Sequence, residues 1–246
     1  MKKCVAAAAL LALLPLSGCG GSEETRTLHV LAAASLTETF TELARDFEEA
    51  HEGVTVKLVF DSSATLAQQA VDGAPGDVLA TADETTMDTA KQGEALGSDP
   101  TVFATNVLTL VTPADNPSHI TSLADLAGTD WVECVETAPC GKVADAVLSA
   151  QEISAAPASR EVDVKAVLAK VTEGEADAGL VYATDAVAAG DAVQTIAIEG
   201  AQDQQTTYPI ATLNQSKDDD LAQGFVDLVT GTSGRQVLAR AGFGTP

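Results

Sequence analysis

Serine residues stand at two points where a strand pattern gives way to a helix pattern. Ser35 follows the apolar run 28–34, and Ser62 and Ser63 follow the alternating run 54–60. In open α/β sheets, ligands bind at the carboxyl ends of strands, where unpaired helix N–H groups favour an anion. A serine there either caps the helix or offers a hydroxyl to a bound anion. The pattern alone leaves both roles open and favours the cap.

Strand-like and helix-like segments alternate along the rest of the chain. Strands are expected at residues 28–34, 54–60, 77–80, 107–111, 130–135, 179–182 and 193–198. Helices are expected at residues 36–47, 66–71, 142–150, 164–171, 185–189, 221–228 and 235–239. This alternation predicts an α/β fold with mostly parallel sheets.

Composition excludes several classes of function. The formal net charge of -23 repels nucleic acid, and 46% hydrophobic residues is ordinary for a globular chain. The three histidines are scattered, without metal-ligand spacing to carboxylates. Motifs for a nucleophile elbow, a phosphate-binding loop or a zinc protease do not occur in the sequence. These features argue against a nucleic-acid-binding protein and against these classes of enzyme and metal site.

The N-terminal residues are typical of an export signal. Lys2 and Lys3 precede the apolar run 5–14, which is too short for a permanent membrane span. Residues 16–19 (LSGC) resemble the lipobox of bacterial lipoproteins, so we expect a signal peptide over residues 1–18 and lipidation of Cys19. Residues 19–25 would form a flexible tether. The alternative is an ordinary signal peptide with a free Cys19.

Several motifs resemble those of periplasmic molybdate-binding proteins of ABC transporters. They are residues 32–37 (AAASLT), 60–67 (FDSSATLA), 73–78 (GAPGDV), 139–141 (PCG), 162–165 (VDVK), 179–187 (GLVYATDAV), 208–210 (YPI) and 241–243 (AGF). Their order matches that family across nearly the whole chain after the tether. Chemically close oxyanion binders share the same architecture.

The resemblance implies a set of neutral hydrogen-bond donors for the oxyanion. Ser35 and Ser63 would donate from side chain and backbone, Cys140 and Val164 from the backbone alone, and Tyr182 from its phenol. A dianion stripped of water is well held by N–H and O–H groups at helix ends. Molybdate would be bound through these residues alone, with no cofactor and no cationic side chain.

The resemblance also implies a two-lobed periplasmic-binding-protein (type II) fold with a hinge crossed twice. We expect the crossings near Ala104 and Thr206, with lobe 1 formed by residues 26–104 and 207–246 and lobe 2 by residues 105–206. Anion binding between the lobes would favour closure.

The implied function is extracytoplasmic capture of molybdate or tungstate and delivery to the permease of an ABC importer. The protein would be a monomer, exported and lipid-anchored to the cell membrane, and not an enzyme. Three alternatives remain: a binding protein for sulfate or phosphate, an enzyme of the same architecture, and a non-catalytic adhesin or sensor lipoprotein that binds no small anion tightly. The enzyme would need Asp61 or Lys142 as general acid or base.

Three residues depart from the family pattern. Cys140 replaces a small residue, which a backbone donor tolerates. Lys142 is either a solvated helix residue or a cation near the anion. Asp61 is either a turn residue pointing away, or an acceptor for the proton of hydrogen phosphate, which molybdate lacks.

Cys134 and Cys140 would be the cysteines left after cleavage before Cys19 and its lipidation. Disulfides persist outside the cytoplasm, so we expect the two to pair. The bridge would fix the start of the helix that carries the Cys140 N–H. Two free thiols are the alternative, since a bridge demands suitable Cβ directions.

Overall fold

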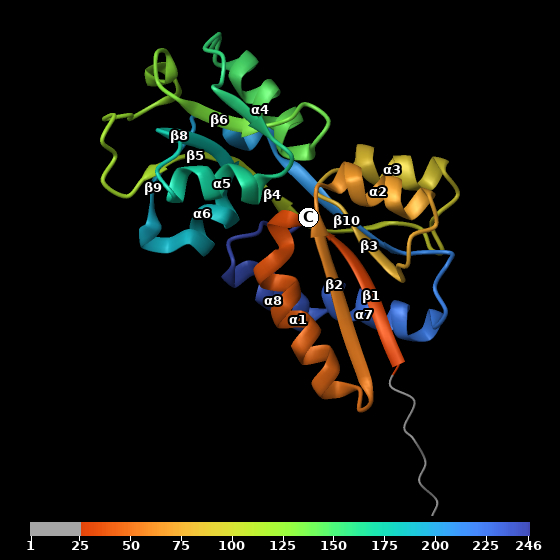
Figure 1. The fold of residues 1–246 in the computed structure, drawn as a ribbon. Coiled ribbons are helices and arrows are strands. Elements are labelled where there is room, and N and C mark those ends of the chain that lie inside the picture. The colour runs from red at the N-terminus through yellow and green to blue at the C-terminus, as the bar shows by residue number, and fades with distance from the viewer. Residues whose placement is uncertain (1–25) are drawn as a thin grey trace, which may run out of the picture.

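The computed structural model describes residues 26–246 as two lobes, each built on its own five-stranded sheet (Figure 1). The expected signal peptide, the lipidation at Cys19 and the tether lie outside the described residues. None of the helices within residues 26–246 is long and apolar enough to cross a bilayer.

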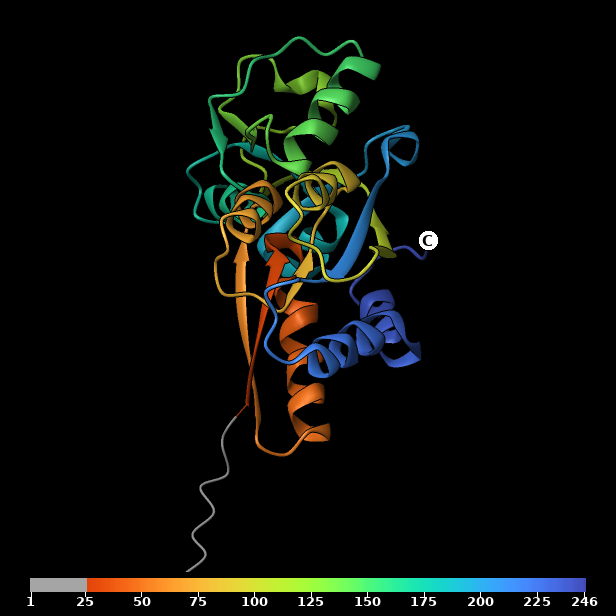
Figure 2. The same ribbon diagram turned by 90° about the vertical axis from the view of Figure 1, so that its right-hand side faces the viewer.

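Lobe 1 is built on the first sheet, which has helices on both faces. Its strands lie in the order β2 (Val54–Asp61), β1 (Arg26–Ala33), β3 (Val78–Ala80), β10 (Thr206–Thr212) and β4 (Thr101–Asn106). One face packs against α1 (Thr37–Ala50), α7 (Asp219–Thr230) and α8 (Thr232–Arg240) around a core that includes Phe40, Phe47 and Phe225 (Figure 2). On the other face, α2 (Ser63–Val71) and α3 (Glu84–Gln92) pack against Leu31 and Leu79.

Lobe 2 is built on the second sheet. Its strands lie in the order β7 (Ser159–Glu161), β6 (Trp131–Cys134), β8 (Ala178–Tyr182), β5 (Leu108–Pro113) and β9 (Val193–Ile196). The helices of this lobe are α4 (Pro139–Ala150), α5 (Val164–Thr172) and α6 (Ala183–Ala189). Trp131, fully buried, is the largest side chain of its core. Short 3-10 turns are η1 (Ala34–Leu36) in lobe 1 and η2 (Leu123–Leu126), η3 (Gly190–Ala192) and η4 (Ala201–Gln204) after β5.

The chain passes between the sheets twice. It leaves the first sheet where β4 ends at Asn106 and enters the second at Leu108, and it returns between Ile196 and Thr206. The first passage therefore comes slightly after the expected position near Ala104, because β4 continues through Asn106.

The expectation of mostly parallel sheets was wrong. In each sheet two strand pairs are parallel and two are antiparallel. The antiparallel pairs all involve β10 or β5, the strands that the chain enters directly after a passage between lobes. The chain runs through β10 and β5 in the direction opposite to the other strands of each sheet. Strands joined by a strand–helix–strand unit, by contrast, run parallel as a rule.

Candidate functional site

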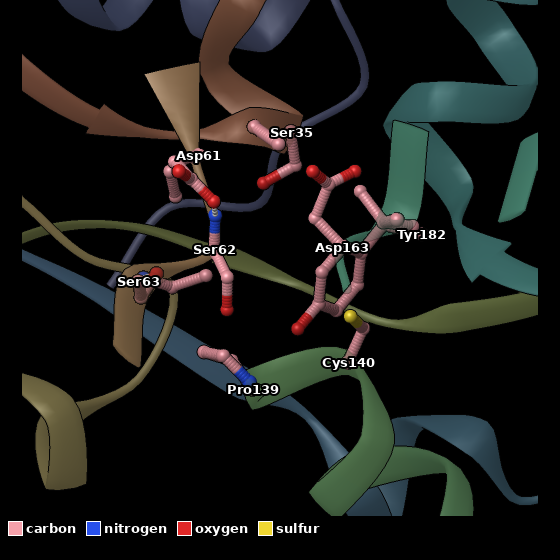
Figure 3. A pocket seen from close by; sticks show the side chains of 12 residues that line it. Ser35, Asp61, Ser62, Ser63, Pro139, Cys140, Asp163 and Tyr182 are labelled. Atoms are coloured by element: carbon pink, nitrogen blue, oxygen red, sulfur yellow. Dashed lines mark hydrogen bonds between the residues drawn. The ribbon is translucent and has the colours of Figure 1, made fainter. Parts of the chain in front are cut away.

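The strand–serine–helix junctions of lobe 1 meet two helix N-termini of lobe 2 at a cavity of about 20 Å³. Lobe 1 lines it with Ala33, Ala34 and Ser35 at the end of β1, and with Asp61, Ser62 and Ser63 at the end of β2. Lobe 2 lines it with Pro139, Cys140, Asp163, Val164 and Tyr182. Figure 3 shows the labelled serines facing Cys140, Asp163 and Tyr182 across this space. The structure thus brings together all five donors implied by the resemblance.

Neither Ser35 nor Ser63 acts as a helix cap. Ser35 lies inside η1, and Ser63 is the first residue of α2, whose N-cap is Ser62. The Ser63 Oγ instead accepts a hydrogen bond from the Ala82 backbone N–H, 2.9 Å away. A hydroxyl that accepts from a neighbour keeps its own proton to donate. The bond to Ala82 therefore leaves the Ser63 hydroxyl proton unused at the wall of the cavity.

Ser35 is held in place by a chain of hydrogen bonds. The Asn106 Oδ1 accepts from the Val107 N–H at 3.0 Å, which identifies the Asn106 Nδ2 as the donor side. This Nδ2 donates to the Tyr208 hydroxyl at 3.4 Å, and the Tyr208 hydroxyl lies 2.9 Å from the Ser35 Oγ. Either hydroxyl can be the donor in the bond between Ser35 and Tyr208. This bond holds the Ser35 Oγ at the wall of the cavity.

Two helices of lobe 2 begin at the cavity. Cys140 is the second residue of α4, and Val164 is the first of α5. Within residues 26–246 the N-cap of α4, Ala138, makes no side-chain cap bond. The side chain of Asp163, the N-cap of α5, accepts from the Ala166 N–H, and the Val164 N–H has no partner within residues 26–246. Unpaired N–H groups at the positive end of a helix dipole suit an anion.

The start of α4 is tied to the end of β6. Cys134 and Cys140 form a disulfide in the structure, with their Cα atoms 5.7 Å apart. Gly141 lies so close to the same loop that a Cβ there would overlap the Val135 carbonyl oxygen. Bridge and glycine together hold the Cys140 N–H against the strand end.

Tyr182 supplies a hydroxyl that lacks a partner. Its side chain is almost fully buried, and within residues 26–246 the phenol oxygen has no hydrogen-bonding partner. Burial raises the pKa of Tyr182 well above its usual value, so the phenol stays protonated and can donate. An unsatisfied buried hydroxyl costs about 1–3 kcal/mol. A bound oxyanion would remove that cost.

The charged groups beside the cavity are carboxylates. Asp61 lines it, and its Oδ1 accepts from the Ser62 N–H at 2.6 Å. Among residues 26–246, no lysine or arginine lines the cavity. The Lys142 Nζ lies 2.8 Å from the Asp83 Oδ2. In the same described part of the chain, no cluster of three or more His, Cys, Asp or Glu side chains could hold a metal ion.

Sequence reasoning named Ser62 but missed three residues of the site. Asp163 lines the cavity, while Tyr208 hydrogen-bonds to Ser35 and Asn106 to Tyr208. Asp163 carries a readable signal, since Asp directly before a helix is a common N-cap. Tyr208 belongs to the matching motif 208–210, but nothing in that motif assigns its hydroxyl a role. Asn106 carries no local signal.

A profile of one known family, described as bacterial extracellular solute-binding protein, matches residues 28–244. The chain belongs to this family. As a bacterial extracellular solute-binding protein, it is an exported protein.

Individual relatives refine the comparison. The chain is 38% identical to the molybdate-binding protein ModA of Mycobacterium tuberculosis over 94% of its own length and 89% of the relative's. A solved periplasmic molybdate-binding protein of Azotobacter vinelandii superposes with a TM-score of 0.78 at 20% identity, covering 89% of this chain and 99% of that one. The sulfate-binding protein SubI of M. tuberculosis gives 0.77 at 18% identity, covering 89% and 86%. The last two values show a shared fold and do not separate one oxyanion from another.

Proposed function

We propose that this solute-binding protein captures molybdate, and tungstate comparably well, and delivers the oxyanion to the permease of an ABC importer. The proposal is carried by one observation: five neutral donor residues from two lobes line a single small cavity. The 38% identity to a molybdate-binding protein over 94% of the chain supports molybdate among the tetrahedral oxyanions.

The donor set has enough binding energy for this role. Each hydrogen bond to a charged group contributes about 1.5–3 kcal/mol. Five donor residues can therefore exceed the roughly 8 kcal/mol of micromolar binding after desolvation and closure are subtracted. Because the donors come from both lobes, the anion also bridges them and stabilises the closed form.

We further propose a binding role without catalysis. The relatives that match over most of the chain are binding proteins. Lys142, one of two side chains that an enzyme could use as acid or base, pairs with Asp83 and does not line the cavity. The proposed role needs no cofactor.

Hydrogen phosphate is the second candidate ligand, and the carboxylates at the cavity are the observation that favours it. Asp61 and Asp163 both line the cavity, and each uses one oxygen to accept a backbone N–H. The second oxygen of either could accept the proton that hydrogen phosphate carries and molybdate lacks. Comparing molybdate and phosphate binding by Asp61→Ala separates the candidates.

The attachment to the membrane is a separate part of the proposal. We propose that Cys19 is lipidated and that the monomeric protein stays at the extracytoplasmic face of the cell membrane. Two acyl chains or more suffice for a stable anchor. A Cys19→Ser variant should then be released from the membrane fraction, and an unchanged distribution would contradict the anchor.

Thermal-shift measurements with molybdate, tungstate, sulfate and phosphate test the choice of ligand. A ligand that binds only the folded state raises the unfolding midpoint by mass action. We expect shifts with molybdate and tungstate, and a weak shift with sulfate, whose shorter bonds leave the donors stretched. A shift with sulfate or phosphate and none with molybdate would refute the proposal.

A further inference from the structure

Two lysines follow closely after the two backbone donors of lobe 2, and both reach across to lobe 1. Lys142 comes two residues after Cys140 on α4, and its Nζ lies 2.8 Å from the Asp83 Oδ2. Lys165 comes directly after Val164 on α5, and its Nζ lies 2.8 Å from the Glu38 Oε1. Among the ion pairs of residues 26–246, these are the two that join the lobes.

Each lobe 1 partner stands beside one of the serine donors. Glu38 lies in the first turn of α1, shortly after Ser35. Asp83 directly follows Ala82, whose N–H holds the Ser63 hydroxyl. The pairs therefore join α5 to the Ser35 junction and α4 to the Ser63 junction.

The partners are held in place by their own lobes. Asp83 caps α3, and its Oδ1 accepts from the Thr86 N–H at 2.7 Å, which leaves Oδ2 for Lys142. Lys165 lies 3.1 Å from Asp185, a fully buried residue of its own lobe. Lobe opening would separate each lysine from its lobe 1 partner and leave these supporting contacts intact.

We propose that Lys142 and Lys165 are positioning residues that clamp the two donor helices of lobe 2 against lobe 1, and so slow the release of the bound anion. This inference rests on the proposed function, because it concerns the same anion site. The lysines touch no ligand. Their ion pairs form only when the lobes close, so the pairing energy adds to the apparent affinity for the anion.

The structure supplies matched controls for both clamps. Lys170 lies on α5 and pairs with Glu161 of its own lobe at 3.0 Å, and its side chain is as exposed as that of Lys142 (34% against 37%). Glu42 lies on α1 like Glu38 and pairs with Arg240 inside lobe 1. Lys170→Met and Glu42→Gln therefore change the charge as Lys142→Met and Glu38→Gln do, without touching a contact between lobes.

The experiment measures affinity and release rate with sodium molybdate as the probe. We expect Lys142→Met and Glu38→Gln each to weaken binding about two- to fivefold, mainly through faster release. Lys170→Met and Glu42→Gln should stay close to the wild type. Lys165→Met is avoided because it would leave Asp185 buried without a cation.

A double-mutant cycle distinguishes the clamp from a general charge effect. Asp83→Asn keeps the cap oxygen for the Thr86 N–H and removes the charge facing Lys142. The double variant Asp83→Asn, Lys142→Met should lose no more affinity than the more affected single variant. Additive losses, or equal losses in clamp and control variants, would overturn the proposal.

A wild type that does not bind molybdate would refute the proposed function rather than the clamp. Small-angle X-ray scattering of the anion-free protein then tests the clamp. We expect the double variant Glu38→Gln, Lys142→Met to have a larger radius of gyration than the double control Glu42→Gln, Lys170→Met. Equal radii would overturn the clamp.

Discussion

The two lobes line the same cavity, but they differ in whether their polar groups at the cavity have hydrogen-bonding partners. In lobe 1, the Ser35 and Ser63 hydroxyls each have a hydrogen-bonding partner inside the lobe, Tyr208 and the Ala82 N–H. In lobe 2, the donors are helix ends and the Tyr182 hydroxyl, which has no partner within residues 26–246. The two lobe 1 hydroxyls thus have partners without a ligand, while lobe 2 carries the cost of an unpaired hydroxyl, which a ligand would remove. Variants of the two lobes should therefore differ in how affinity and stability change.

Loss of a lobe 1 hydroxyl should have the largest effect on affinity. Ser63→Ala removes a donor to the anion and the acceptor of the Ala82 N–H. We expect molybdate affinity to fall roughly 10- to 100-fold, and the free energy of unfolding without anion to fall by about 1 kcal/mol. Calorimetric titration and urea unfolding measure the two quantities. Ser35→Ala should behave similarly, and unchanged affinity in both would return the serines to a structural role.

Loss of the Tyr182 hydroxyl in lobe 2 should change affinity and stability in opposite directions. Tyr182→Phe removes a hydroxyl that is unsatisfied without the anion, so the anion-free protein should gain up to about 1 kcal/mol in its free energy of unfolding. Molybdate affinity should fall about tenfold, because one donor to a charged ligand is lost. Urea unfolding with and without molybdate shows both effects. Lower stability together with weaker binding would place Tyr182 in the same category as the serines.

Loss of the disulfide should affect lobe 2 geometry more than global stability. The bridge closes a short loop, with a sequence separation of 6, and such a loop contributes at most about 2–3 kcal/mol to stability. A Cys134→Ser, Cys140→Ser variant should bind molybdate several-fold more weakly, with a modest decrease in melting midpoint. Mass spectrometry of the alkylated, unreduced protein first establishes the bond. Unchanged affinity would show that the disulfide does not influence anion binding.

The smallest expected effect is a pH dependence that arises in lobe 2. Burial raises the pKa of Asp185 to about 6, despite the nearby Lys165. The pKa of an unfolded Asp is about 3.9, so between these values the folded state binds more protons than the unfolded state. The ionised Asp185 therefore lowers stability above about pH 6, and this loss is relieved as the pH falls toward 4.

Urea unfolding at pH 7 and pH 5 measures this contribution. The wild type should gain more stability, or lose less, than Asp185→Asn when the pH is lowered. Identical changes in the two proteins would show that Asp185 does not titrate in this range.

Local patterns in the sequence predicted the parts of the fold that depend on nearby residues. The junctions at Ser35 and Ser63, the helix that begins at Val164 and the buried β8 strand occur where the pattern placed them. The helix α4 begins at Pro139, three residues before the expected start at residue 142. β4 was missed because its polar threonines weaken the apolar alternation. α3 was missed because only Met87 and Ala90 give its buried face apolar character.

Features that depend on contacts between segments far apart in the sequence could not be predicted. The antiparallel position of β10 follows from the second passage between lobes, which no local pattern reports. The Asn106–Tyr208 hydrogen bond joins residues 102 positions apart. The clamp between Lys165 and Glu38 spans 127 positions. The five proposed donors could be named only through the resemblance, because serine at a helix start also predicts a cap.

Anomalous diffraction from crystals grown with molybdate tests the central claim most directly, because it locates the molybdenum atom. We expect a single peak in the cavity, with oxygens about 2.7–3.2 Å from donors of Ser35, Ser63, Cys140, Val164 and Tyr182. A peak elsewhere, or an anion in contact with only one lobe, would contradict the account.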